Sequence, residues 1–185
     1  MQQFSIPLDQ VTFGLFTSIC NDTKNLELAK ELLSAWQNGL LFKPSIQCCT
    51  QLISVFAKNC DPESALATFD NYCKTSMPDV ILFNAIMTAC IACNQATKSF
   101  ELFKRMNMYS LSPDNRTYGI LILACSETGN VEMAKSIFEK VKDRSIQVGD
   151  IDCNQLIKAF ASSQVCLPEA FEVDFFVLLV VIIGV

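Results

Sequence analysis

Apolar residues recur along this chain in two alternating clusters, and the pair of clusters repeats about every 35 residues. Counted from the start of each repeat, apolar side chains at offsets 5, 8, 9 and 11–12 share one helical face, and those at 21, 24 and 25 share the face of a second helix. The repeats start 36, 34, 35 and 35 residues apart, at Leu8, Pro44, Pro78, Pro113 and Val148. This pattern predicts an all-α fold, a right-handed α-solenoid of helix-turn-helix repeats of about 35 residues.

Residues that start and stop helices fall where this period requires them. Asp79 and Asp114 each follow a proline and are suited to accept N–H bonds at a helix start. Asp61-Pro62-Glu63 has the order expected at the start of a second helix, and Gly129-Asn130 separates the two helices of its unit. The predicted units are 8–43, 44–77, 78–112 and 113–147, with a partial unit at 148–162 and an atypical apolar tail at 163–185.

Composition narrows the classes of function. The 185 residues are 51% apolar, enough for a sizeable core, and the formal net charge of −5 lacks the strongly basic character of many nucleic-acid binders. Histidine is absent, which removes the commonest general base and the commonest metal ligand. We therefore expect no enzyme, no cofactor, no metal site and no small-molecule substrate.

The chain has ten cysteines, and the period predicts a packing role for them. Three share offset 12, where other units carry phenylalanine: Cys20, Cys90 and Cys125. Cysteine there acts as a small core residue, and we interpret the lone Cys90/Cys93 pair as core rather than as a zinc site. The thiols indicate a reducing compartment. We also expect Trp36 and Tyr72 to pack in the core rather than stack on bases.

Pro78–Ser112, with Phe83-Asn84, Phe103 and Met106, resembles the pentatricopeptide repeat family, and the resemblance extends over about 8–162. The Trp and Leu-Gly-x-x-Tyr pattern of the related tetratricopeptide repeats is absent. The order of unit types is similar to the alternating long and short arrays of organellar RNA-editing members. The resemblance implies single-stranded RNA as the partner, possible contacts with other RNA-processing proteins, and a role in the editing, processing or stability of mitochondrial or plastid transcripts.

In this family each unit reads one base with a few side chains. The resemblance implies base-reading residues just after the first-helix aromatic and at the start of the following unit: Thr50, Asp79, Asn84, Asp114 and Asn154. It implies secondary RNA contacts at the position where the family wedges an apolar side chain against bases: Val11, Ile81, Arg116 and Ile151. Thr50 with Asp79 resembles the guanine-preferring pair and Asn84 with Asp114 the uracil-preferring pair, which together imply a 5′-GU-3′ step.

Structural roles remain open for the same residues. Asp79 and Asp114 could act as helix caps, Asn84 could be a solvated polar residue, and Arg116, which departs from the apolar wedge, could be a surface charge. For the whole chain the alternative is a protein-binding helical-repeat scaffold of tetratricopeptide-like type. The acidic balance favours that alternative, as do Gly14 and Gly119, which leave two units without a reading side chain.

The two ends of the chain depart from the repeat. The first thirteen residues contain no basic residue and no long apolar run, so no targeting peptide is predicted; the protein is cytosolic or this chain lacks its original start. The apolar run 175–185 would form a helix of roughly 16 Å, shorter than the roughly 30 Å hydrocarbon core of a bilayer. It could be a tail anchor, a segment packed on the open solenoid end, or a truncated or mis-joined terminus. We favour the last and expect no membrane partner.

Overall fold

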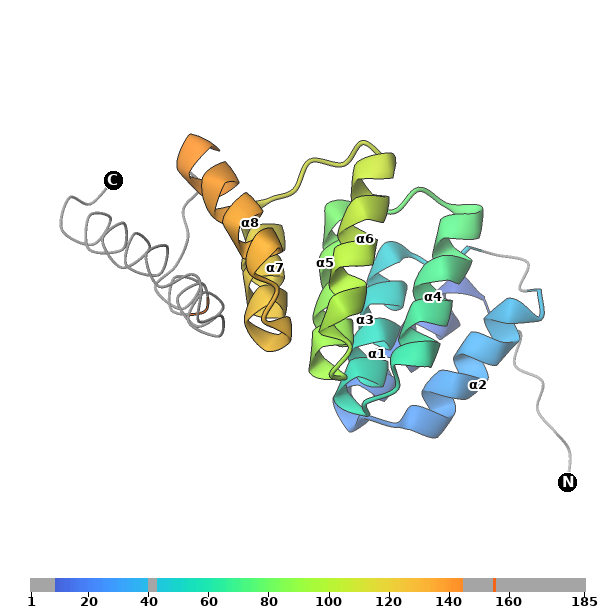
Figure 1. Cartoon of the computed structure of the whole chain (residues 1–185). Helices are drawn as coiled ribbons and strands as arrows, with labels where there is room; N and C mark the ends of the chain where they lie inside the picture. The colour runs from blue at the N-terminus through green and yellow to red at the C-terminus, as the bar shows by residue number, and fades with distance from the viewer. Residues whose placement is uncertain (1–8, 40–42, 145–154, 156–185) are drawn as a thin grey trace, which may run out of the picture. The chain divides into compact units, whose positions relative to one another are not determined.

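The computed structural model describes residues 9–39, 43–144 and 155, and within these residues the secondary structure is helical, without strands (Figure 1). The helices follow one another as α1 (Gln10–Thr23), α2 (Leu26–Gln37), α3 (Ile46–Lys58), α4 (Pro62–Thr75), α5 (Val80–Ala92), α6 (Ala96–Met108), α7 (Asn115–Thr128) and α8 (Val131–Arg144). The first helices α1, α3, α5 and α7 start 36, 34 and 35 residues apart. The predicted all-α helical-repeat fold is confirmed, whereas the unit boundaries stay predictions.

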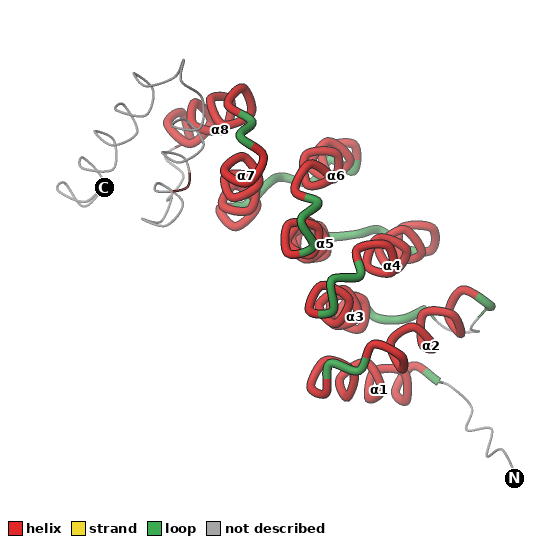
Figure 2. The backbone as a smooth tube through the Cα atoms, turned by 60° about the horizontal axis from the view of Figure 1, so that its bottom comes forward, coloured by secondary structure: helices red, strands yellow, loops and turns green. Residues whose placement is uncertain are grey.

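The chain divides into two compact units at Gln95–Ala96. In the first unit, α3 packs against α1, α4 and α5, and α2 contacts α1, α3 and α4. In the second unit, α7 packs against α6 and α8. The tube in Figure 2 shows the helices joined by short turns in both units. Each helix thus contacts helices close to it in sequence, as expected for a repeat fold.

The turn between the two helices of each hairpin uses one left-handed residue at a constant position. These residues, with φ from 53° to 64°, are Lys24, Cys60, Asn94 and Gly129. In every case the next residue donates its N–H to the carbonyl five residues earlier, at distances of 2.8 to 3.3 Å, which closes the end of the first helix. Glycine is the residue best suited to this conformation, and only the fourth turn carries one.

The core consists of the apolar positions that the period selects. The aromatic column of the first helices is buried, with Phe13 and Phe83 fully enclosed and Tyr118 3% exposed. Phe83 meets Phe69 of α4 edge-on, with ring centroids 4.9 Å apart, a favourable aromatic geometry. These rings hold α5 against α4 inside the first unit.

The packing roles predicted for Cys20, Cys90, Cys125 and the large aromatics are confirmed, whereas Cys93, which was expected in the core with Cys90, is only half-buried. Cys20, Cys90 and Cys125 are fully buried, and Trp36 and Tyr72 are buried as well. Burial raises the pKa of the Cys125 thiol to about 12, so this thiol stays protonated and apolar at neutral pH.

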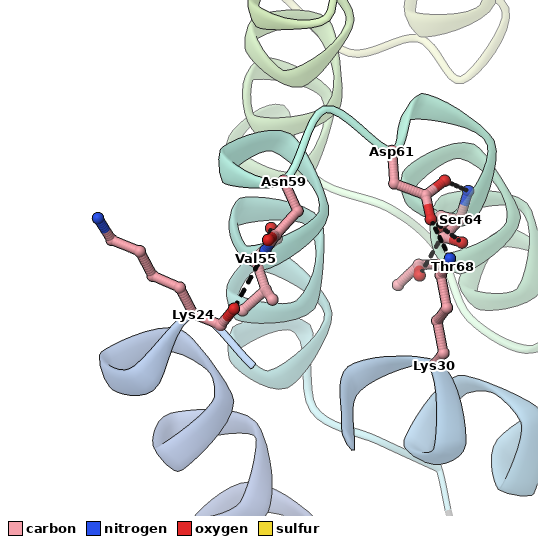
Figure 3. A network of polar contacts seen from close by, with 7 residues as sticks. All are labelled: Lys24, Lys30, Val55, Asn59, Asp61, Ser64 and Thr68. Atoms are coloured by element: carbon pink, nitrogen blue, oxygen red, sulfur yellow. Dashed lines mark hydrogen bonds and ion pairs between the residues drawn. The ribbon is translucent and has the colours of Figure 1, made fainter. Parts of the chain in front are cut away.

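Polar contacts link successive hairpins of the first unit, as Figure 3 shows for two of them. Lys30 Nζ lies 3.0 Å from Asp61 Oδ2, and Asn59 Nδ2 donates to the carbonyl of Lys24 at 3.3 Å. Burial raises the pKa of Asp61, but the hydrogen bonds from Lys30 and Ser64 outweigh it, so the pKa is lowered overall. These contacts stabilise the spacing between α1–α2 and α3–α4.

No helix in the described ranges is long and apolar enough to cross a membrane. Several predictions concern residues outside those ranges, among them Ile151, Asn154 and the apolar run 175–185.

Candidate nucleic-acid interface

The first turn of each first helix is built in the same way. An oxygen of the N-cap side chain accepts the N–H of the residue three positions later, from Thr12 to Asp9 at 2.7 Å, Cys48 to Ser45 at 3.3 Å, Leu82 to Asp79 at 2.8 Å and Thr117 to Asp114 at 2.7 Å. The capping role considered for Asp79 and Asp114 is therefore confirmed. These caps satisfy donors that the helix leaves unpaired.

Capping leaves room for a second role at these carboxylates. Asp79 accepts the Leu82 N–H through Oδ1, and a carboxylate has two oxygens with about four acceptor sites in all. Asp79 is half-buried and Asp114 is exposed. A base that presents an N–H group could thus be bound at either carboxylate without loss of the cap.

Asp9 holds the same position in the first unit, although it was not predicted as a site residue. It forms a capping box with Thr12, as Asp114 does with Thr117. Backbone and side-chain hydrogen bonds from Thr12 lower the pKa of the Asp9 carboxyl. The missing proline before Asp9 hid the match, and the shared Asp-x-x-Thr spacing is the signal that could have revealed it.

Three of the positions predicted for secondary RNA contacts lie in the described residues, and all three face solvent. Val11 is 69% and Ile81 66% exposed, and Arg116 is exposed as well. Each lies two residues after the cap of its helix. An isolated apolar side chain at the surface is ordinary, but here exposure recurs at the same position of α1 and α5.

The predicted base-reading position, three residues further along each first helix, is less exposed to solvent. Thr50 is half-buried and donates its hydroxyl to the Gln47 carbonyl at 2.8 Å, which leaves its oxygen able to accept from a base. Asn84 is only 3% exposed, so its interpretation as a solvated surface residue is wrong. It lies on α5, where seven of the 13 residues are buried. Asn84 is covered by tertiary packing although Ile81, three residues earlier, is exposed. The sequence pattern does not reveal this difference.

Within the described residues no three His, Cys, Asp or Glu side chains gather in a way that could hold a metal ion. The first turn of each first helix presents three groups that could recognise a ligand. They are a carboxylate or hydroxyl that caps the helix, an exposed side chain two residues later, and a polar or small residue three residues after that. The fold and these turns define the class of helical-repeat α-solenoids.

Comparison with known proteins identifies the family. Sequence models of the pentatricopeptide repeat domain, the PPR repeat family and the PPR repeat match residues 35–93, 78–127 and 116–146. The chain belongs to the pentatricopeptide repeat family.

The relatives are longer proteins of the same family from Arabidopsis thaliana. One is 25% identical over 91% of this chain and 28% of its own length. A mitochondrial relative is 25% identical over 77% of this chain and 20% of its own length. A chloroplastic one is 24% identical over 86% of this chain and 16% of its own length. The chain therefore spans less than a third of each of these relatives.

Solved structures share the fold. The pentatricopeptide repeat protein PPR10 in complex with an 18-nucleotide psaJ RNA element superposes with a TM-score of 0.66 at 18% identity, covering 91% of this chain and 24% of that one. The pentatricopeptide repeat domain of Arabidopsis thaliana protein-only RNase P 1, in complex with tRNA, gives a TM-score of 0.71 at 15% identity, covering 88% and 87%.

Proposed function

We propose that this chain binds single-stranded RNA through the first turns of its first helices. The observation that carries the proposal is the repetition of one surface. In α1 and α5 an aspartate caps the helix and an apolar side chain two residues later is about two-thirds exposed. The RNA complexes of two proteins with this fold support the proposal.

The chemistry of these turns suits single-stranded bases. Exposed Val11 and Ile81 offer apolar surface on which a base can rest, a contact available to any base. Thr50, whose hydroxyl proton is directed to Gln47, offers an acceptor to a base N–H, and Asp79 offers a second acceptor. Guanine presents adjacent N–H donors on its Watson–Crick edge, so Thr50 with Asp79 would favour guanine.

The second reading position requires access that the unbound chain does not offer. Asn84, which the family resemblance assigns to uracil, is 3% exposed. Its amide can donate and accept at once, as uracil requires. We propose that RNA binding opens this position, with Ile81 on the same helix forming the first contact. The 5′-GU-3′ step and the roles of Arg116, Asn154 and Ile151 belong to the same proposal.

The wider role follows from the relatives. We propose that the working protein acts on transcripts of the mitochondrion or plastid, in editing, processing or stability, since one relative is named mitochondrial and another chloroplastic. The part of the protein described here would supply recognition, and the proposal gives it no catalytic step. Other RNA-processing proteins would be recruited to the bound transcript.

A protein-binding scaffold is the second candidate, and one observation favours it. Val11, Leu15 and Ile19 form an exposed apolar row along α1, at 69%, 60% and 48% exposure, and such a row suits a partner helix. The row does not repeat, because the residues equivalent to Ile19 in α3 and α5, Val55 and Ala89, are buried. Exposure at the Val11 position does repeat, and this recurrence favours RNA.

The proposal is tested by replacing exposed apolar residues inside and outside the predicted surface. Ile81→Ser removes a predicted base contact, and we expect it to weaken binding of a single-stranded RNA about 5- to 150-fold, since a base contact contributes roughly 1–3 kcal/mol. Met108→Ser is the matched control, because Met108 is 82% exposed on the second helix α6. Fluorescence anisotropy at low salt measures both. Equal affinities for the two variants, or no binding by the folded wild type, would reject the proposal.

A further inference from the structure

Two thiols from successive hairpins of the first unit lie at the same end of their helices. Cys60 occupies the left-handed position of the α3–α4 turn, with φ of 53°, and is exposed. Cys93 is the C-cap of α5 and is half-buried. Neither belongs to the first turns that form the candidate RNA surface.

A shared carbonyl group places these two residues together. The oxygen of Ala57 accepts the backbone N–H of Cys60 at 3.1 Å. The same oxygen lies 4.0 Å from Sγ of Cys93. The backbone N–H of Cys60 and the thiol of Cys93 therefore both lie next to the same carbonyl oxygen.

The preceding pair of hairpins shows that this proximity follows from the repeat. Asn59 and Cys93 occupy equivalent positions in successive repeats. Lys24 and Cys60 are likewise equivalent, as the left-handed turn residues of their repeats. Asn59 Nδ2 donates to the carbonyl of Lys24 at 3.3 Å, a contact drawn in Figure 3. The side chain at this position of one unit therefore reaches the turn of the unit before it, and in the α3–α5 pair both residues are cysteines.

The surroundings give the two thiols different reactivity. Burial, followed by the nearby Cys60 and Asp61, raises the pKa of the Cys93 thiol. Cys60 is exposed and can meet a small oxidant directly. Oxidation would therefore begin at Cys60, and Cys93 would react second, as a resolving thiol.

We propose that Cys60 and Cys93 form a site of reversible oxidation, at which peroxide converts the two thiols to a disulfide between successive repeats. The sulfur of Cys60, after losing its proton, attacks one peroxide oxygen. An S–O bond forms, the O–O bond breaks, and the products are a sulfenic acid and one water. The sulfur of Cys93 then loses its proton and attacks the sulfenic sulfur, so that the S–S bond forms and a second water leaves. Two thiols lose two electrons, and hydrogen peroxide takes them up.

The disulfide would tie the α3–α4 turn to the end of α5. Such a link closes a loop of about 34 residues and restricts the unfolded chain. It would fix the spacing between α3 and α5, and a thiol reductant would release it. In a reducing compartment a bond of this kind is transient and responds to redox conditions.

The test treats the whole chain with hydrogen peroxide and divides the sample in two. In the first part, we expect the intact mass to fall by two hydrogen atoms. In the second part, the remaining thiols are blocked by an alkylating reagent, and we expect peptide mapping to identify a peptide pair joined through Cys60 and Cys93. Thermal unfolding should move up by about 5 °C, and dithiothreitol should reverse both changes. Cys60→Ser and Cys93→Ser should each abolish the link.

Cys73→Ser is the control, because Cys73 is the other cysteine of intermediate exposure in the first unit and should leave the Cys60–Cys93 link intact. A disulfide that joins other cysteines, or oxidation of Cys60 to a sulfinic acid with Cys93 still free, would overturn the proposal. Neither readout involves RNA, so failure here would be distinct from failure of the proposed function.

Discussion

Among the second helices that the structure describes, α6 has the weakest start, because Gln95 stands where the others carry a short capping side chain. The equivalent residues before α2, α4 and α8 are Asn25, Asp61 and Asn130, and each accepts the N–H three residues later at 3.1 Å. The longer side chain of Gln95 instead leaves Oε1 buried without a hydrogen-bond partner. Glutamine is a poor N-cap because its extra methylene carries the oxygen past the helix end.

Shortening this side chain should therefore stabilise the protein. We expect Gln95→Asn, which keeps the amide and restores the length found at Asn25 and Asn130, to raise the free energy of unfolding by about 1 kcal/mol. Urea unfolding followed by circular dichroism measures the change. The reverse substitution Asn130→Gln should cost a similar amount. If Gln95→Asn destabilises the protein, this account of the α6 start is wrong.

The Lys30–Asp61 pair predicts a dependence of stability on pH. The pKa of Asp61 is lowered from 3.8 in the folded protein, so the carboxylate contributes stability above that value and loses the contribution as the pH falls through the folded pKa. We expect Asp61→Asn, which retains a capping oxygen, to cost about 0.5–1 kcal/mol at neutral pH. The gap to wild type should close below about pH 4.

Glu63 provides the control for that measurement. It lies in the same first turn of α4 and is exposed, so Glu63→Gln should change the unfolding free energy by less than about 0.5 kcal/mol. A gap for Asp61→Asn that stays constant down to acid pH would show that the ion pair contributes nothing.

The burial and backbone conformation of single residues can be predicted from the sequence at some positions and not at others, for physical reasons. Buried Cys20 and Cys125 could be predicted because the period aligns them with phenylalanines. Asn84 could not, since its burial depends on tertiary packing around a polar side chain that the apolar pattern does not register. The left-handed conformation of Cys60 was also hidden, because the usual signal for such a turn is glycine.

At the scale of elements, the helices were predictable from two signals that agree. Apolar residues set the face of each helix, and the Pro-Asp pairs set the starts of α5 and α7. Where one signal is missing, the prediction weakens: Asp9 lacks the proline, and Gln95 lacks a short capping side chain. The surface of a helix cannot be predicted from its own sequence alone, because its neighbours decide what is covered.

This dependence on neighbours gives a prediction for α1 and α3. Ile19 and Val55 share one position in their units, yet Ile19 is 48% exposed and Val55 is fully buried. We expect Val55→Ala to lower the free energy of unfolding by about 2 kcal/mol through the cavity that it leaves. Ile19→Ala deletes more atoms but should cost less than about 0.5 kcal/mol. Chemical denaturation of both variants provides the comparison, and equal losses would contradict the exposure of this face of α1.

At the scale of the whole molecule, the period determines what the sequence can and cannot predict. A helical repeat is held together by contacts between adjacent elements, so a period of about 35 residues is sufficient to predict the fold. Recognition is different, because it depends on which side chains of each first turn are accessible. The resemblance implied RNA contacts at Val11, Ile81 and Arg116, and the structure exposes these residues, whereas the burial of Asn84 could not be predicted.

The central claim is that successive first turns read successive bases of single-stranded RNA. We would measure the affinity of the chain for short single strands that carry each of the sixteen central dinucleotides in one fixed flank, across a series of salt concentrations. The account predicts the tightest binding to 5′-GU-3′, with Thr50→Ala reducing the preference at the first base and Asn84→Ala at the second. Equal affinity for all sixteen, or a preference that these two substitutions leave unchanged, would contradict it.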